Sequence, residues 1–392
     1  MKTLDEVFAG FDRISERNTA RVLDAFRRHR VSDSHFAGTT GYGYSDLGRD
    51  NLERVFADVM GAESALVRVQ FACGTHAIAC ALFGAVKSGA VLLSATGAPY
   101  DTLRGVVAGK PGSLQDYGVG YRELGLLSDG TPDLRGLAVA AREVAAVFIQ
   151  RSRGYASRPA IDINTLESMV KVIREVNQSA VIVVDNCYCE FVDVREPPMV
   201  GADFTAGSLI KNPGGGLAPS GGYVAGRADL VERAAARLTA PGLGAEVGSS
   251  LGQNRLLYQG LFTAPHAVAQ ALKTVAYAAY ILEERGFQTE PRYFETRADI
   301  IQTLFLGEPQ RLLAFCKGIQ SGSPIDSFLK PEPWDMPGYD CPVVMAAGTF
   351  IQGGSLELTC DAPMREPYAV YIQGGLTFEA GKYAIDRAVK NL

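Results

Sequence analysis

A lysine lies between an apolar run and a glycine-rich loop, a position that favours chemical use of its amine. Lys211 follows the run FTAGSLI (204–210) and precedes NPGGG. Upstream, the run AVIVVDN (180–186) carries Asp185 near its end. Such a pair predicts a lysine that forms a Schiff base with pyridoxal phosphate and an aspartate that keeps the pyridine nitrogen protonated. The alternatives are a solvated lysine in a surface turn and an aspartate that caps a helix or forms a salt bridge at a strand end.

A phosphate group requires an anion site, and the sequence offers one. Gly74 and Thr75 begin a helix of small residues directly after the apolar run ALVRVQF (65–71). Free N–H groups and the positive end of the helix dipole attract a dianion there, and glycine permits close approach. Ser208 could add a hydroxyl, and Tyr100, in the loop after 91–94, could stack on the cofactor ring. An ordinary strand-to-helix turn and a half-buried loop tyrosine are equally compatible with these residues alone.

The elements that must position these residues follow from the alternation of short apolar runs with amphipathic stretches. This alternation predicts a largely parallel sheet covered on both faces by helices. After about residue 245 we expect a smaller α+β domain, with helices over 253–285 and near 296–316. The predicted strands of the first part cover 65–71, 91–94, 144–150, 180–186, 204–210 and 221–226, and its helices 3–29, 52–60, 75–87, 102–109 and 164–177. In the second part, strands are expected over 343–351 and 355–360, and a closing helix over 377–390.

Composition excludes several classes of protein. The chain has 392 residues, of which 47% are hydrophobic and 21% charged, as in globular proteins. Its net charge of −5 and the lack of a basic block argue against a nucleic-acid partner. The seven scattered cysteines are expected to be reduced thiols, and the N-terminus has no apolar core of signal-peptide length. The most apolar stretch, 267–284, contains Gln270 and Lys273, so we expect no membrane span and a cytoplasmic location.

Several motifs together resemble the aluminium-resistance protein family, described as cystathionine β-lyase-like or methionine γ-lyase-like enzymes of pyridoxal-phosphate fold type I. The resemblance covers nearly the whole chain. It implies a large domain of the aspartate aminotransferase type, a small C-terminal domain, and active sites shared within a homodimer or homotetramer. The motifs are TGYGYSDLGRDNLERVFA (40–57), CGTHAIACALFG (73–84), PYDTL (99–103), VVDNCYCEFV (183–192), AGSLIKNPGGGLAPSGGYVAG (206–226), GLFTAPHAVAQALK (260–273) and REPYAVYIQGGLTFE (365–379).

The resemblance also assigns roles to individual residues. Lys211 matches the Schiff-base lysine, Asp185 the pyridine-nitrogen acid and Tyr100 the tyrosine that stacks on the ring. Arg365 is the best match for the arginine that binds a substrate α-carboxylate, with a surface ion pair as its alternative. The expected phosphate cradle consists of Gly74, Thr75 and Ser208, with Cys73 as a further cofactor-binding residue. The expected arm to a neighbouring subunit's site carries Tyr42, Tyr44 and Arg49.

Two positions depart from the usual family pattern. Cys73 replaces a more common serine, and Cys189 replaces the glycine of a CYGE motif. A larger, softer sulfur atom at either position could reshape the pocket or be neutral packing.

The sequence thus predicts an N-terminal arm (1–50), a pyridoxal-phosphate-binding domain (51–245) and a small domain (246–392). The expected reaction is β- or γ-elimination from a sulfur-containing amino acid, in which Lys211 removes the α-proton. Two alternatives remain: γ-replacement or transamination on the same scaffold, and a non-catalytic, stress-related protein that binds the cofactor.

Overall fold

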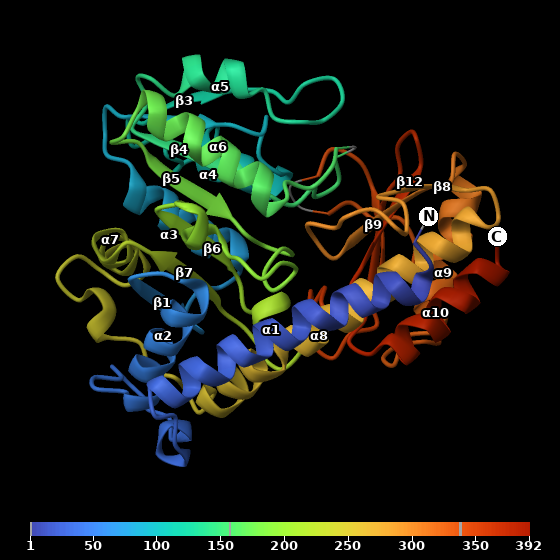
Figure 1. Ribbon diagram of the computed structural model, residues 1–392, viewed down its shortest axis with the longest axis horizontal. Helices are drawn as coiled ribbons and strands as arrows, with labels where there is room; N and C mark the ends of the chain where they lie inside the picture. Colours follow the sequence, from blue (N-terminus) through green and yellow to red (C-terminus); the bar gives the residue numbers. More distant parts are fainter. Residues whose placement is uncertain (1, 157, 337–338) are drawn as a thin grey trace.

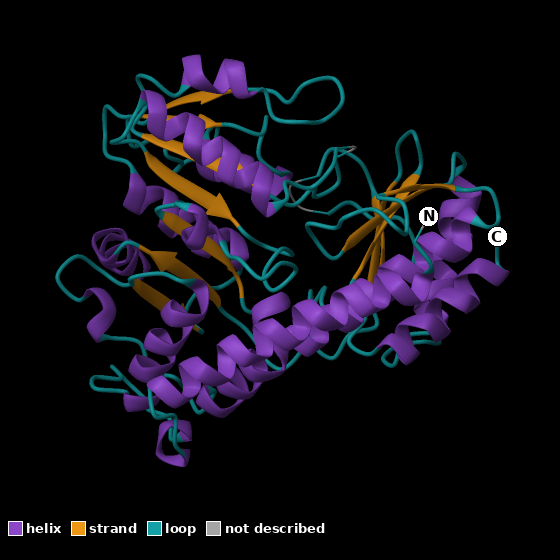
Figure 2. Cartoon of the chain, in the orientation of Figure 1, coloured by secondary structure: helices purple, strands orange, loops and turns teal. Residues whose placement is uncertain are grey.

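The chain folds around two β-sheets, a large one that is mostly parallel and a smaller antiparallel one (Figures 1 and 2). The computed structural model describes residues 2–156, 158–336 and 339–392. The strands of the large sheet are β1 (Ser64–Arg68), β2 (Val91–Ser94), β3 (Gly120–Glu123), β4 (Ala146–Gln150), β5 (Val181–Asp185), β6 (Phe204–Ser208) and β7 (Gly222–Gly226). They lie in the order β1-β7-β6-β5-β4-β2-β3, and only β7 is antiparallel to its neighbours.

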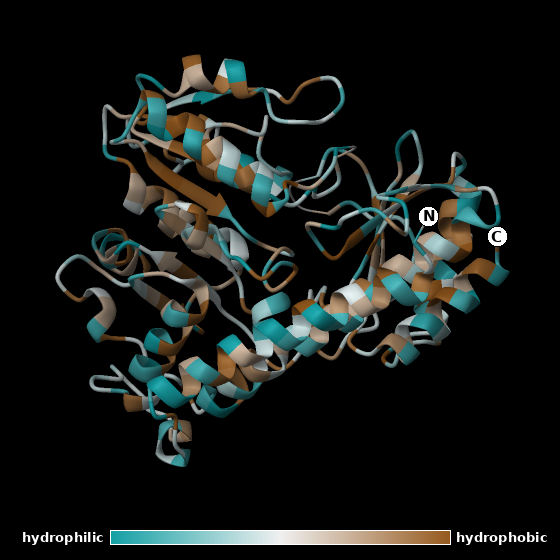
Figure 3. Ribbon diagram, viewed as in Figure 1, coloured by the Kyte–Doolittle hydropathy of each residue, from teal (hydrophilic) through white to brown (hydrophobic). Residues whose placement is uncertain are grey.

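Helices cover both faces of the large sheet because its strands are apolar on both sides. In β5, Val183 packs into one core, and Ile182 and Val184 pack into the core on the opposite face. Figure 3 shows β5 as hydrophobic, whereas the neighbouring helix α6 mixes hydrophobic and hydrophilic residues. One face is covered by α3 (Gly74–Ala85), α4 (Asp101–Val107) and α7 (Ala228–Leu238), and the other by α2 (Leu47–Met60), α5 (Leu134–Ala140) and α6 (Ile163–Val176).

The smaller sheet lies in the C-terminal part of the chain. Its order is β10-β11-β12-β9-β8, and every neighbouring pair is antiparallel. One face packs on helices, so this part has a core of its own. The strands are β8 (Gln288–Glu290), β9 (Ile301–Phe305), β10 (Val343–Ala346), β11 (Thr359–Pro363) and β12 (Ala369–Gln373), and the helices are α9 (Pro309–Ser321) and α10 (Phe378–Lys390).

Two long helices run between the sheets. Helix α1 (Leu4–Arg28) lies along α8 (Asn254–Glu283), and both pass from the large sheet to the small one (Figure 1). Val22 of α1 shares a buried core with Tyr258 of α8, and the ring of Phe8 meets that of Phe378 edge-on at 5.0 Å. No helix in the described part of the chain is long and apolar enough to cross a membrane. The contacts of Val22 and Phe8 show that the N-terminal helix packs on its own chain.

The predicted alternation of strands and helices is confirmed, with errors in the C-terminal part and several omissions. The strand expected over 343–351 ends at residue 346, and of the strand expected over 355–360 only residues 359 and 360 belong to β11. The helices expected near 296–316 are wrong over their first part, because residues 301–305 form β9 between β12 and β8. The elements β3, α5, α7 and β8 were not predicted from the sequence. Short 3-10 helices complete the elements of the described residues: η1 (Asp33–Phe36), η2 (Pro197–Val200), η3 (Asn212–Gly214) and η4 (Gly244–Glu246).

Candidate active site

The carboxyl ends of three neighbouring strands form the floor of a cavity of about 540 Å³. Gln150 ends β4 and is paired in register with Asp185 at the end of β5, which in turn is paired with Ala206 of β6. Ser208 ends β6, and Lys211 follows in the turn that leads into η3. Ligands of open α/β sheets bind at this edge. The register therefore brings residues that are far apart in sequence to one site.

Asp185 is a buried carboxyl group, with 5% of its surface exposed. Its Oδ1 accepts a hydrogen bond from the Cys187 backbone N–H at 3.0 Å. Burial raises the pKa of Asp185, and the Lys211 amine and the Cys187 hydrogen bond oppose that shift. No lysine or arginine nitrogen in the described residues lies within salt-bridge distance of it. A buried carboxylate in this position favours a cationic ligand.

Lys211 is half-buried, and its amine contacts an aromatic ring. The Nζ atom lies 3.9 Å from the centroid of the Tyr188 ring. Burial lowers the pKa of Lys211, but Cys187, Tyr188 and Asp185 outweigh burial, so the pKa lies well above its ordinary value. The protein alone therefore holds this amine as a cation at neutral pH. The solvated surface turn considered from the sequence does not describe this lysine.

The predicted phosphate cradle comes together at the start of α3. A Cβ atom added to Gly74 would lie 3.1 Å from Ser208 Cβ and 3.5 Å from Cys187 Sγ, so glycine permits the close packing of this helix end on β6. Cys73 is the residue that precedes the helix, and Thr75 lies in its first turn. The three cradle residues and Cys73 all line the cavity. Since the first N–H groups of a helix have no partner within it, this corner suits an anion.

Tyr100 spans the cavity between this corner and the strand ends. Its hydroxyl lies 2.9 Å from Thr75 Oγ1, and its backbone N–H donates to Gln150 Oε1 at 3.0 Å. Burial raises the pKa of the Tyr100 hydroxyl, and the nearby Asp185 carboxylate adds to that shift. The ring is therefore neutral and fixed at both ends, beside Asp185.

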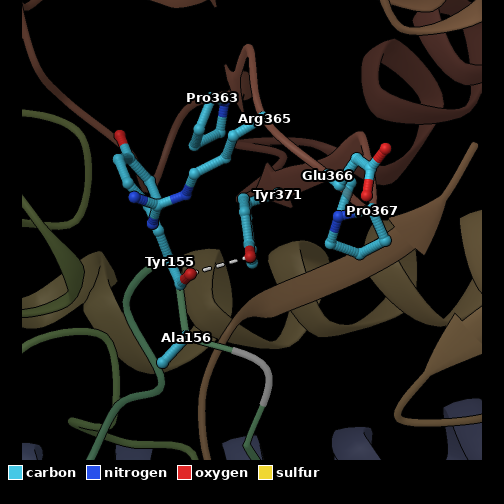
Figure 4. Close-up of a pocket in the computed structure, with 8 residues that line it drawn as sticks. Tyr155, Ala156, Pro363, Arg365, Glu366, Pro367 and Tyr371 are labelled. Carbon is cyan, nitrogen blue, oxygen red and sulfur yellow. Dashed lines mark hydrogen bonds between the residues drawn. The ribbon is translucent and has the colours of Figure 1, made fainter. Parts of the chain in front are cut away.

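Arg365 lies at the rim of the cavity, in the turn between β11 and β12. Its Nη1 donates to Asp340 Oδ1 at 2.8 Å, and both side chains are exposed. Figure 4 shows Arg365 extending toward Tyr155, in the wall of a second cavity of about 260 Å³. In that wall the Tyr371 hydroxyl donates to the Tyr155 carbonyl oxygen at 2.8 Å. Arg365 thus borders both cavities, and it also forms the surface ion pair that was its alternative.

Three predicted substrate-binding residues do not line the cavity of their own chain. Tyr42 and Tyr44 are 74% and 57% exposed, and their rings stack at 5.6 Å. Arg49 is buried, and its Nη1 donates to the carbonyl oxygens of Gly43 and Gly248 at 2.7 and 2.8 Å. Within the chain, Arg49 therefore fixes the loop that carries Tyr42 and Tyr44, and the rings of these two tyrosines are exposed.

The structure also brings in residues that the sequence analysis missed. A segment directly after β4 contributes buried polar groups to the cavity, and Tyr188 contributes its ring. The sequence contained a signal for them, because QRSRGYASR (150–158) begins at the last residue of a predicted strand. That residue, Gln150, is paired with Asp185 at the same edge of the sheet. The missed residues with large side chains in the lining are Arg104, Gln150, Arg153, Tyr155, Arg158, Tyr188, Ile210 and Tyr339.

The two departures from the family pattern have different positions. Cys73 lines the cavity and is exposed. Cys189 is 1% exposed and lies in the turn beneath the site. The thiol at position 73 can therefore contact a ligand directly, whereas the one at 189 acts through packing.

Comparisons with known proteins agree on one family. The family model described as methionine gamma-lyase matches residues 1–392. The uncharacterized protein YnbB of Bacillus subtilis is 49% identical over 386 residues, which cover 97% of this chain and 92% of YnbB. A crystal structure from Listeria monocytogenes, of a candidate cystathionine β-lyase involved in aluminium resistance, is 48% identical with a TM-score of 0.97 and covers 99% of this chain and 97% of its own. A carbon-sulfur lyase involved in aluminium resistance from Clostridium novyi is 47% identical with a TM-score of 0.95, covering 98% and 92% of the two chains.

The fold extends to more distant proteins. The pyridoxal-5'-phosphate-dependent protein YhfS from Escherichia coli is 18% identical with a TM-score of 0.64, covering 100% of this chain and 98% of its own. At that identity the likeness concerns the fold alone. The chain has the fold type I architecture of pyridoxal-phosphate enzymes, with the smaller α+β part that the sequence predicted.

Proposed function

Because this chain belongs to the methionine gamma-lyase family, we propose that it is a pyridoxal-phosphate-dependent carbon-sulfur lyase. It would cleave a sulfur-containing amino acid by β- or γ-elimination, consuming one water and releasing a thiol, ammonia and a 2-oxo acid. One observation carries the proposal: Lys211, Asp185 and the start of α3 line the same cavity. These are the amine, the acid and the anion site that the cofactor requires.

The residues present fit the cofactor. Its phosphate would bind the first turn of α3, where Gly74 packs so closely on Ser208 that an added Cβ would lie 3.1 Å from the Ser208 Cβ. Its ring would lie beside Tyr100, and its nitrogen would meet Asp185, a buried carboxyl without a cation at salt-bridge distance in the described chain. Lys211 would hold it covalently. When bound, the cofactor would supply the electron-accepting ring that eases loss of the α-proton.

The chain's own residues would perform the proton transfer. Lys211 Nζ, once free, would take the α-proton of the substrate as general base and hold it as an ammonium. Asp185 would keep the ring nitrogen protonated, because a carboxylate with 5% exposure is poorly compensated by water. Tyr100, which is hydrogen-bonded to Thr75 at the start of α3 and to Gln150, would hold the cofactor ring in place.

We propose that Arg365 binds the α-carboxylate of the substrate. Its position at the rim supports this role, since a guanidinium there can reach a ligand in the cavity. The ion pair with Asp340 would have to open or rotate, and its cost is small because both partners are exposed. A guanidinium offers a two-pronged hydrogen bond that matches a carboxylate.

We further propose that the sites are shared within a homodimer or homotetramer in the cytoplasm. Tyr42 and Tyr44 support this, because two stacked aromatic rings at the surface suit a contact with another subunit. The loop that carries them is fixed by Arg49, so it is ordered before any contact forms. The three-part division at residues 50 and 245 belongs to this proposal.

The test is to mix the purified protein with pyridoxal phosphate and to titrate it with a panel of sulfur-containing amino acids. We expect a visible absorbance band for the bound cofactor and stoichiometric thiol, ammonia and 2-oxo acid. Pyruvate would indicate β-elimination, and 2-oxobutyrate γ-elimination. The Lys211→Ala variant should lose the turnover and serves as the control.

Other outcomes would replace the proposal. Formation of a new amino acid, in which the γ substituent has been exchanged for another thiol and no ammonia is released, would indicate γ-replacement. Conversion of a 2-oxo acid to an amino acid would indicate transamination. A protein that binds the cofactor but transforms no amino acid would be a non-catalytic binding protein. If the protein stays colourless with added cofactor, the proposed enzymatic function is refuted.

A further inference from the structure

The turn after β5 presents an aromatic face to the proposed base. The Tyr188 ring centroid lies 3.9 Å from Lys211 Nζ, well within the range of a cation–π interaction. No carboxylate oxygen in the described residues lies within 4.0 Å of that nitrogen, and no side-chain hydrogen bond to it is formed there. The Tyr188 ring therefore contacts the amine directly, with no carboxylate paired to it in the described residues.

The backbone at Tyr188 is held in a conformation that a tyrosine rarely adopts. Its φ angle is +70°, in the left-handed region, which is unfavourable for a bulky residue. The surrounding turn fixes it: Ile300 N–H donates to the Tyr188 carbonyl at 3.2 Å, and Cys189 N–H donates to the Asn186 carbonyl at 2.9 Å. In this conformation the Tyr188 ring faces the Lys211 amine.

The ring acts as a neutral quadrupole and not as an anion. Burial raises the pKa of the Tyr188 hydroxyl, and the facing Lys211 opposes that shift. The hydroxyl is therefore protonated at neutral pH. Other titratable groups also interact electrostatically with the Lys211 amine. They lie at the end of β5 and in the turn after it, before α4, and in β11: Asp185, Cys187, Glu190, Tyr100 and Asp361.

We propose that Tyr188 is a positioning residue for Lys211, whose ring binds the ammonium form of the amine more strongly than the neutral form. This rests on the proposed function, in which Lys211 is the base that receives the substrate proton. The quadrupole attracts a cation and has little effect on a neutral amine, so the ring increases the basicity of Lys211. It also restrains the amine beside Asp185 when the amine carries no covalent partner.

The experiment measures the amine itself, without any substrate. Full-length protein purified without the cofactor is treated with acetic anhydride, and acylation of Lys211 is quantified by mass spectrometry relative to the exposed Lys171. In Tyr188→Leu we expect the pKa of Lys211 to fall, so that acylation at neutral pH becomes about tenfold faster. Tyr188→Phe keeps the ring and should react as the wild type does.

Two further variants keep the test decisive. Tyr188→Met replaces the ring with a flexible chain and should behave as Tyr188→Leu, so a folding defect in one variant does not hide the effect. Tyr339→Leu removes another ring of the cavity and should leave Lys211 unchanged. The proposal is overturned if the ring-free variants react at the wild-type rate, or if Tyr188→Phe or Tyr339→Leu accelerates acylation as strongly. Because no turnover is measured, absence of lyase activity would refute the proposed function without altering this result.

Discussion

At the scale of single residues, a substitution of Asp185 should distinguish an effect on the chemistry of the cofactor from an effect on its binding. In Asp185→Asn the amide oxygen can still accept the Cys187 hydrogen bond, but the negative charge is lost. We expect kcat to fall roughly 100-fold or more, as for loss of one preorganised electrostatic group. Steady-state kinetics at saturating pyridoxal phosphate measure this. Ser208→Ala is the control: it should weaken cofactor binding about tenfold and leave kcat nearly unchanged, and equal losses of kcat in both would contradict the assignment.

A second residue, Glu190, predicts how stability depends on pH. Its carboxyl group is fully buried, accepts a hydrogen bond from the Tyr223 hydroxyl at 2.8 Å, and leaves Oε2 without a partner in the described residues. Burial raises the pKa of Glu190 to about 8. The folded protein therefore binds a proton that the unfolded chain releases above its ordinary pKa, so the stabilisation is complete at acid pH and is lost as pH rises to about 8.

Glu190→Gln should flatten this dependence. The free energy of unfolding of the wild type should decrease by several kcal/mol between acid pH and about 8, and the variant should lose most of that decrease. Urea unfolding at a series of pH values measures it. Glu175→Gln, at an exposed position of α6, should keep the wild-type slope. A slope that is unaltered in Glu190→Gln would mean that another group titrates.

At the scale of elements, α8 packs in close contact with η3, the turn that follows Lys211. A Cβ atom added to Gly260 of α8 would lie 2.3 Å from the Gly214 carbonyl oxygen of η3. Gly260→Ala must therefore displace one backbone from the other, at a cost of about 1–3 kcal/mol, and should weaken cofactor binding through the Lys211 turn. Gly10→Ala in α1 is the matched control, because its Cβ would meet no atom closer than 4.0 Å. That control should be neutral or stabilising by up to about 1 kcal/mol, since alanine favours a helix. Thermal unfolding and cofactor titration of both variants compare them.

The elements also explain what the sequence could and could not predict. The runs that became β4, β5 and β6 are apolar on both faces, so their nature and order were readable, and Asp185 and Lys211 could be placed at one sheet edge. Residues 301–305 were misjudged because pairing with β12 and β8, which no local pattern encodes, makes them a strand. Tyr188 was missed because its position depends on a φ of +70° and on a bond from Ile300, over 100 residues away. The roles of the site residues stay predictions until they are tested.

At the scale of the whole molecule, α1 and α8 join the two sheets, and the cavity lies where both parts contribute. Asp185 and Lys211 come from the large sheet, whereas Arg365 and Tyr339 come from the C-terminal part. Tyr155 links them, since its hydroxyl donates to Asp361 of β11 at 2.7 Å. Any movement between the two parts would therefore change the distance between the proposed base and the proposed carboxylate site.

The exposed tyrosine pair predicts that two copies of the chain complete one site. Lys211→Ala lacks the base, and the double variant Tyr42→Ala, Tyr44→Ala lacks the arm, so each alone should have little activity. When both chains are co-expressed with different tags, a hybrid dimer contains one site in which every residue is intact. A statistical mixture should therefore recover about a quarter of wild-type activity, and the isolated hybrid about half. If the hybrid stays inactive while it is dimeric by light scattering, the tyrosines do not reach the neighbouring site, because each subunit would then have to complete its own.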